Sequence, residues 1–195
     1  MTGRPRSEAA DRAILAATVT LLARDGYQSL RMSDVARTAG VGKPTLYRRH
    51  ANKPDLVAAA IVALTAGPQP EPDLPADTRT ALLSLVRSTA RALATPGGMT
   101  ILGSLLAQEQ RDPELIEAFR TRVFEPRHAV VTDVLLRGIA AGEVDRSTSV
   151  PIVIDVLFGA LLARAVLGEP VTEAWLEEVV DLAMRGMAPG PAVLR

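Results

Sequence analysis

Residues 33–50 read SDVARTAGVGKPTLYRRH, two short segments of helical pattern separated by glycines. The first segment ends near Ala39, and the second begins at Lys43 with Pro44 in its first turn, a position that suits proline. The joining residues 39–42 read AGVG, and a turn of three or four residues containing glycine is typical of a helix-turn-helix. In such a unit the second helix enters the major groove of DNA with its N-terminal residues toward the bases. The pattern therefore predicts a helix-turn-helix.

The second helix of this unit has two faces with different tasks. Leu46 and His50, four residues apart, are expected to face the first helix. The opposite arc carries a lysine cation, a threonine hydroxyl with its methyl group, and a phenol, which suit phosphates, thymine methyl groups and base edges. Lys53, at the head of the next helix, adds a cation where backbone N–H groups already favour anions. With helix caps included, the candidate DNA-binding residues are Ser33, Gly42, Lys43, Pro44, Thr45, Tyr47, Arg48, His50 and Lys53.

A longer pattern surrounds the helix-turn-helix. It comprises Asp34-Val35-Ala36, the run from Ala39 to Arg48, Asn52-Lys53 and Asp55-Leu56-Val57, with Ile14 to Ala17 and Asp25-Gly26-Tyr27 upstream. This pattern, which covers about residues 8–66, resembles the DNA-binding signature of the TetR family of transcriptional repressors. The remainder resembles the family only in its helical character and length. The resemblance implies an all-α homodimer in which three N-terminal helices read DNA and a helical C-terminal domain dimerises and binds an inducer.

Two positions depart from the family pattern. Gly42 stands where the family often has a serine, so a possible contact between a hydroxyl and a phosphate is lost. His50 stands where a large aromatic residue usually packs the helices together. We interpret His50 as a core or hinge residue rather than a base reader, and a hydrogen bond to phosphate is the alternative. Tyr47 has the alternatives of a DNA contact, which the resemblance favours, and packing on the first helix.

The charge is divided unevenly along a chain that is neutral as a whole. The 195 residues contain 22 Lys and Arg against 22 Asp and Glu, but residues 1–60 hold ten basic and five acidic residues. A basic segment on an acidic body is expected when one end of a protein meets phosphate, although a solvated basic face gives the same count. With no cysteine and only two histidines, we expect no disulfide, no metal site and no cofactor.

Helical periodicity dominates the rest of the chain, without a convincing alternating strand. Residues 67–78 read GPQPEPDLPADT, and four prolines in this segment mark a domain boundary or stiff connector. We therefore expect an all-α fold of about nine helices, with a DNA-binding domain at 8–66 and a ligand-binding and dimerisation domain at 75–188. A long helix starting at Asp112-Pro113 should be kinked at Pro126, because a proline ring clashes with the preceding turn. Asp155 and Arg164 interrupt the most apolar stretch, 152–167, so we expect a cytoplasmic protein without a membrane partner.

Self-association is predicted for the last two helices. Residues 152–167 are apolar nearly all round, as expected for a helix covered on two sides, and small residues there would admit another helix closely. The final helix carries a second apolar stripe. A single monomer core is the alternative, and the family resemblance favours the dimer. The candidate interface residues are Ile152, Val156, Gly159, Ala160, Ala163, Trp175, Val179, Leu182 and Gly186.

A pocket for a mostly apolar, medium-sized ligand is expected among the intervening helices. The candidates are inward positions of these helices, and a residue at such a position is more often part of the ordinary core than a ligand contact. Arg127, beside the predicted kink, is a candidate polar contact. The set consists of Met99, Leu102, Leu106, Phe119, Val123, Arg127, Phe158 and Leu162.

Three functions remain to be separated. The first is a homodimeric repressor that binds a palindromic operator and is released by a small effector, and an activator would use the same helices. The second is a helical enzyme, which we disfavour because the acidic residues at 177–181 have no histidine near them to form a catalytic or metal cluster. The third is a helical ligand-binding module without DNA activity, against which the intact basic motif argues.

Overall fold

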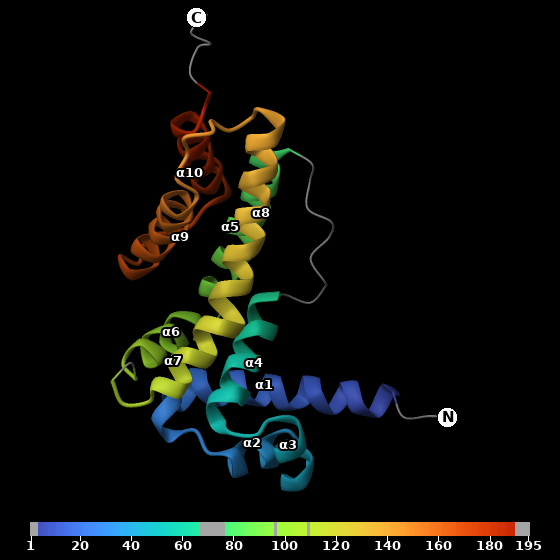
Figure 1. Ribbon diagram of the computed structural model, residues 1–195. Coiled ribbons are helices and arrows are strands. Elements are labelled where there is room, and N and C mark those ends of the chain that lie inside the picture. Colours follow the sequence, from blue (N-terminus) through green and yellow to red (C-terminus); the bar gives the residue numbers. More distant parts are fainter. Residues whose placement is uncertain (1–3, 67–76, 96, 109, 190–195) are drawn as a thin grey trace, which may run out of the picture. The chain divides into compact units, whose positions relative to one another are not determined.

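Figure 1 shows the computed structural model, which describes residues 4–66, 77–95, 97–108 and 110–189. These residues form ten α-helices and one π-helical segment, with no β-strand among them, so the all-α prediction is confirmed. Residues 67–76 of the predicted connector lie outside the described residues. The elements are α1 (Arg4–Ser29), α2 (Met32–Thr38), α3 (Lys43–Arg49), α4 (Lys53–Ala66), α5 (Thr78–Ala94), α6 (Gly98–Leu106), α7 (Pro113–Phe119), η1 (Arg120–Phe124), α8 (Glu125–Ala141), α9 (Val150–Val166) and α10 (Glu173–Gly186).

The chain packs as two compact units that are each discontinuous in sequence. Of the described residues, 4–66 and those within 94–125 belong to the first unit, and 77–93 and 126–189 belong to the second. Residues 94–125 thus pack with the N-terminal helices, although they follow the predicted boundary. The reason is apolar burial, since Ile101, Leu105 and Leu115 share one core with α1 and α4. The predicted domain limits, 8–66 and 75–188, stay a prediction. The two packing units have different limits, because 94–125 pack with the N-terminal helices.

Helix caps account for several of the element boundaries. The Asn52 side chain accepts a hydrogen bond from the backbone N–H of Asp55 at 2.8 Å, and Asp112 caps α7 by accepting from the N–H of Leu115 at 3.1 Å. Gly26, with φ 72°, breaks the regular helix within α1. The expected cap at Ser33 is wrong, because α2 begins at Met32 and places Ser33 inside its first turn.

Glycine permits a very close approach of α1 and α6 in the first unit. Gly97 has φ 84°, and a Cβ built there would lie only 2.2 Å from the Cβ of Ala23. A side chain at 97 would therefore meet both a backbone conformation that L residues avoid and a steric overlap. The contact helps to hold residues 98–106 against α1.

The predicted long helix is interrupted at 120–124 by η1. The N–H of Glu125 bonds the carbonyl of Arg120, five residues back, as in a π-helix. The interruption immediately precedes Pro126, which has no N–H to offer to the preceding turn. The sequence-based expectation of a disturbance near Pro126 thus has a structural counterpart, although it lies on the N-terminal side of the proline.

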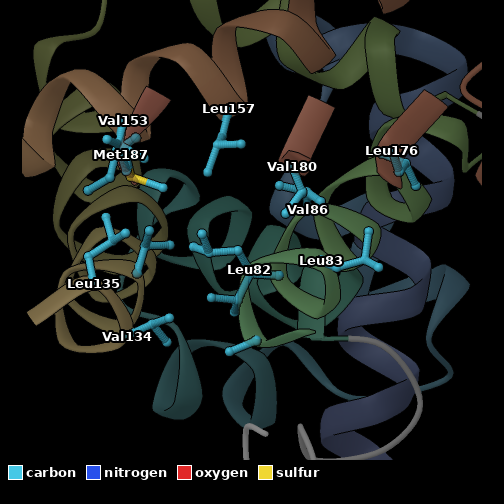
Figure 2. Packing of buried hydrophobic residues seen from close by; sticks show 14 of the residues in the cluster. Leu82, Leu83, Val86, Val134, Leu135, Val153, Leu157, Leu176, Val180 and Met187 are labelled. Atoms are coloured by element: carbon cyan, nitrogen blue, oxygen red, sulfur yellow. The ribbon is translucent and has the colours of Figure 1, made fainter. Parts of the chain in front are cut away.

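The second unit is built around side chains from four helices, α5, α8, α9 and α10. Figure 2 shows Leu82 and Val86 of α5, Leu135 of α8, Leu157 of α9 and Val180 of α10 within this cluster. Burial of such side chains is the main stabilising contribution, at about 1.5–3 kcal/mol for each residue. α9 and α10 lie side by side in Figure 1 and bury only one face each in this core.

Candidate nucleic-acid interface

The two helices of the helix-turn-helix are fixed by a tight, hydrogen-bonded turn. Gly40 adopts φ 66°, and the N–H of Val41 bonds the carbonyl of Ala36 at 3.0 Å. Val35 and Leu46 are fully buried in the core that α2 and α3 share with α1 and α4. Figure 1 shows α2 and α3 next to each other beside α1. The short helix α3 is thus held through its inward face, which carries Leu46, and its other side chains face the solvent at least in part.

The outward arc of α3 carries most of the candidate DNA-binding side chains. Lys43, Pro44 and Arg48 are exposed, and 51% of Tyr47 is accessible. Thr45 is half-buried, while Gly42, the N-cap, is exposed and has no side-chain capping bond. Ser33 is exposed on α2. The structure therefore brings a cation, a guanidinium and a phenol together on one solvent-facing surface.

His50 lies on the inner side of the unit. Its side chain is 12% exposed, and its Nδ1 lies 3.5 Å from Oδ2 of Asp55. Burial lowers the pKa of His50, while the nearby carboxylates of Asp55 and Asp11 raise it and Arg122 lowers it. This position agrees with the interpretation of His50 as a core or hinge residue, and a phosphate contact stays untested.

Lys53 is engaged within the protein. Its Nζ lies 4.1 Å from the centroid of the Tyr27 ring and donates to the carbonyl of Gln28 at 3.4 Å. Burial lowers the pKa of Lys53, and Asp112 raises it. A cation over an aromatic face contributes about 0.5–2 kcal/mol. Any role of Lys53 in phosphate binding would therefore compete with these contacts.

Polar contacts between distant segments were missed by the sequence reasoning. The Tyr27 hydroxyl donates to Asp112, and Gln28 donates to the buried Gln108. Burial, followed by the Asp112 contact, raises the pKa of Tyr27. These bonds tie the end of α1 to the loop between α6 and α7. In the sequence, only the family-like pattern Asp25-Gly26-Tyr27 drew attention to Tyr27, and it did not indicate that Asp112 is its hydrogen-bond partner.

The candidate interface residues of α9 and α10 fall into two groups. Ile152, which is 61% exposed, lies on one exposed side of α9 with Val156, Gly159 and Ala163. Leu182 and Gly186 are exposed on α10. Ala160, Trp175 and Val179 are half-buried, and the latter two pack on the core of the second unit. Arg164 lies with its guanidinium carbon 4.7 Å from the Trp175 ring centroid and donates to the carbonyl of Pro170 at 2.8 Å.

The candidate ligand residues are distributed over both units, and two of them are not inward. Leu106, the last residue of α6, is 58% exposed, and Leu162 is exposed on α9. Val123 is buried, and Phe119 packs against the first core with its ring edge-on to Phe124. Met99 and Leu102 are half-buried. In the second unit Phe158 packs on the core, and Arg127 donates to the Thr89 hydroxyl at 3.2 Å.

Two family models match the chain. One, described as bacterial regulatory proteins of the tetR family, matches residues 14–60, which include the helix-turn-helix. The other, described as a tetracyclin repressor-like C-terminal domain, matches residues 71–183, more than half of the chain. The chain belongs to the TetR family. It is a transcriptional regulator with an N-terminal DNA-binding domain and a C-terminal ligand-binding domain, and the family consists of regulators rather than enzymes.

Individual proteins agree with this assignment to the TetR family. A protein of Mycobacteroides abscessus named DNA-binding transcriptional repressor TetR is 31% identical over 90% of this chain and 92% of its own. The crystal structure of the TetR family transcription regulator SCO0332 matches with a TM-score of 0.67 at 28% identity, over 92% and 99% of the two chains. The fold is also that of the regulator FadR from Bacillus subtilis, solved with stearoyl-CoA, at a TM-score of 0.69 and 19% identity over 90% and 98%.

No helix within the described residues is long and apolar enough to cross a membrane.

Proposed function

We propose that this TetR-family regulator is a homodimeric repressor that binds a palindromic operator and is released by a small, mostly apolar ligand. The observation that carries the proposal is the exposed arc of α3, with Lys43, Tyr47 and Arg48 presented by the helix-turn-helix. Lysine and arginine neutralise phosphates, whereas side chains that reach base edges determine the sequence that is read. The proposal places the protein in the cytoplasm, where bacterial DNA lies.

The exposed apolar surface of α9 and α10 supports dimerisation through a second copy of the chain. Apolar side chains such as Ile152 and Val156 gain stability when they are removed from water, and contiguous surfaces of this kind mark interaction sites. Two copies related by a two-fold axis would present two recognition helices to half-sites about one turn of DNA apart, roughly 34–36 Å. A palindromic operator is the DNA counterpart of that symmetry.

The effector class is inferred from chemistry and from a fold relative. The candidate contacts in 98–124, such as Met99, Leu102 and Phe119, are apolar, and FadR was solved with a fatty acyl thioester. A mostly apolar compound fits this set. For release, the compound must bind more tightly to the form of the protein that binds DNA poorly, because equal affinity for both forms would shift nothing.

DNA binding is tested by selection from a random pool with the purified full chain. We expect enrichment of one palindrome, and replacement of both Lys43 and Tyr47 by Ala should abolish its binding. Lys43→Ala alone should reduce the slope of log affinity against log salt by about 0.9 if one phosphate contact is lost. Arg146→Ala, which removes an exposed cation in the second unit, is the matched control and should change neither quantity. Enrichment of no palindrome, or equal binding by the double variant, would refute the proposal.

Repression and release need a separate measurement. A reporter driven by a promoter that contains the selected palindrome should fall in output when the protein is expressed, and rise when it is not. Acyl thioesters and fatty acids of graded chain length are then added to the purified complex with DNA. A compound that raises both the melting temperature and the rate of DNA release supports the effector class. Increased reporter output on expression would show that the protein is an activator.

A further inference from the structure

The carboxylate of Asp55 joins three segments of the first unit. Asp55 lies in the first turn of α4, directly after the connection from α3, and its side chain is only 17% exposed. One oxygen, Oδ1, is paired with the guanidinium of Arg122 in η1. The other, Oδ2, accepts the backbone N–H of Ala51 at 3.2 Å and lies 3.5 Å from Nδ1 of His50. A single side chain thus contacts both the end of α3 and a segment 67 positions further along the chain.

We propose that Asp55 is a positioning residue for the recognition helix: it fastens the C-terminal end of α3 to Arg122, so that DNA affinity depends on an arginine that does not touch DNA. This inference rests on the proposed function, because it assigns Arg122 and Asp55 to the orientation of the helix that reads the operator. It goes beyond that function by naming a residue outside the helix-turn-helix that sets its affinity.

The end of α3 needs an external anchor. The helix has only seven residues, and Leu46 is its one fully buried side chain. Helices of this length have little stability of their own, so tertiary contacts determine their direction. The chain leaves α3 at His50 in an extended conformation, with φ −132°. The half-buried pair of Arg49 with Asp11 and the contacts of Asp55 to Ala51 and His50 contribute to holding this exit from the helix.

Arg122 is presented to Asp55 by an anchored segment. Its neighbour Val123 is buried in the first core, while Arg122 itself is half-exposed. Because η1 is π-helical, its residues project at different angles from those of a regular α-helix. Because Arg122 pairs with Asp55, a shift of 120–124 would carry the guanidinium toward or away from the carboxylate. The other charged or titratable groups near this cluster are His50 and Asp11, which is paired with Arg49.

The experiment compares variants of the full chain on the selected operator, at a temperature well below the unfolding transition. Arg122→Gln should weaken binding by about threefold, in the range expected for a partly exposed pair, and Asp55→Asn by about tenfold. Arg122→Lys should recover part of the loss. The double variant should bind no more weakly than Asp55→Asn alone, because the two residues act through one contact. Arg120→Gln is the matched control, since Arg120 pairs with Glu117 on the exposed side of the same segment.

Two further readouts separate positioning from other roles. The salt dependence of binding should be unchanged in Arg122→Gln, whereas a direct phosphate contact would reduce the slope by about 0.9. The imidazole of His50, followed by NMR in a His128→Gln background, should titrate at higher pH in Arg122→Gln, because Arg122 lowers the pKa of His50. A structural role confined to fold stability would lower the melting temperature and leave the affinity of the folded protein unchanged.

Failure of this inference differs from failure of the proposed function. If the unchanged protein binds its operator and Arg122→Gln binds as well as Arg120→Gln, the positioning role is wrong and the proposed function stands. The positioning role is equally wrong if the losses from Arg122→Gln and Asp55→Asn multiply in the double variant. If the unchanged protein binds no selected DNA, both are overturned.

Discussion

Gly159 offers a test of the proposed dimer in which the effects on one chain and on two chains have opposite signs. It lies in the middle of α9 on the exposed apolar surface, between Val156 and Ala163. A Cβ built at this position has no atom within 4 Å. Within one chain there is room for a Cβ at position 159, and we expect the exposed helix face to accommodate Gly159→Leu. In a dimer that closes on this surface, the added side chain would occupy the space of the second copy.

The magnitudes follow from these two situations. Glycine within an exposed helix is less favourable than a good helix former by about 0.8–1.0 kcal/mol, so Leu should stabilise α9 in each chain. That gain is present before and after association and cancels in the dissociation constant. Overpacking costs about 1–3 kcal/mol at each site, and two-fold symmetry doubles it to about 2–6 kcal/mol per dimer. The dissociation constant should rise by about 30-fold to about 20,000-fold.

Sedimentation equilibrium over a range of protein concentrations measures this constant directly. Gly103→Leu is the control, because Gly103 is also helical and exposed, also has open space around its Cβ position, and lies in α6. We expect the control to keep the dissociation constant of the unchanged protein. Equal self-association of the Gly159 and Gly103 variants would show that the surface of α9 is not the interface and would remove the structural support for a palindromic operator.

Three further outcomes are expected. Gly97→Ala should reduce the free energy of unfolding by about 2–5 kcal/mol, combining a left-handed φ with the overlap on Ala23. Gly142 has φ 76° and open space around its Cβ position, so Gly142→Ala should reduce the free energy of unfolding by only about 1–2 kcal/mol. Urea titration measures both variants, and equal losses of stability would contradict a steric overlap between a side chain at 97 and Ala23. Burial lowers the pKa of His50 in the folded chain, so below its ordinary value of about 6.5 the unfolded chain binds more protons. The free energy of unfolding should therefore fall as the pH drops through 6.5 toward the folded pKa. His50→Gln should flatten this part of the pH profile, and an unchanged profile would argue against a lowered pKa of His50. Gly42→Ser should stabilise the protein by a few tenths of a kcal/mol through N-capping, as measured by thermal melting. If the serine hydroxyl reaches a phosphate, the variant should also bind the operator more tightly in a gel-shift assay, and weaker binding would exclude that contact.

Local features of the sequence were sufficient for much of the fold. Glycines and caps act within a few residues, so the turn at Gly40 and the caps at Asn52 and Asp112 could be predicted from their neighbours. The buried position of Leu46 followed from helical spacing in the same way. Ser33 was assigned wrongly as a cap because residue preference alone does not fix where a helix begins: α2 begins at Met32, and its N-cap, Arg31, makes no side-chain capping bond.

Contacts between distant segments could not be predicted from a single sequence. Lys53 was expected to point toward phosphate, but its ammonium lies over Tyr27, 26 positions earlier. No periodicity relates Asp55 to Arg122, and no local signal indicates that 94–125 pack with the N-terminal helices. The outward position of Leu106 likewise depends on where α6 ends. Each of these features arises from tertiary packing.

The π-helical segment 120–124 also bears on how this chain aligns with its relatives. A π-helical turn accommodates one more residue than the α-helical turn it replaces, so the segment behaves as a single-residue insertion that the helix has absorbed. Each residue of an α-helix advances by about 100° around the axis. Because the π-helical turn takes up the extra residue, loss of one residue here would restore a regular α-helix without that rotation. Homologues one residue shorter at this point should therefore have a regular α-helix over the positions that correspond to 120–124.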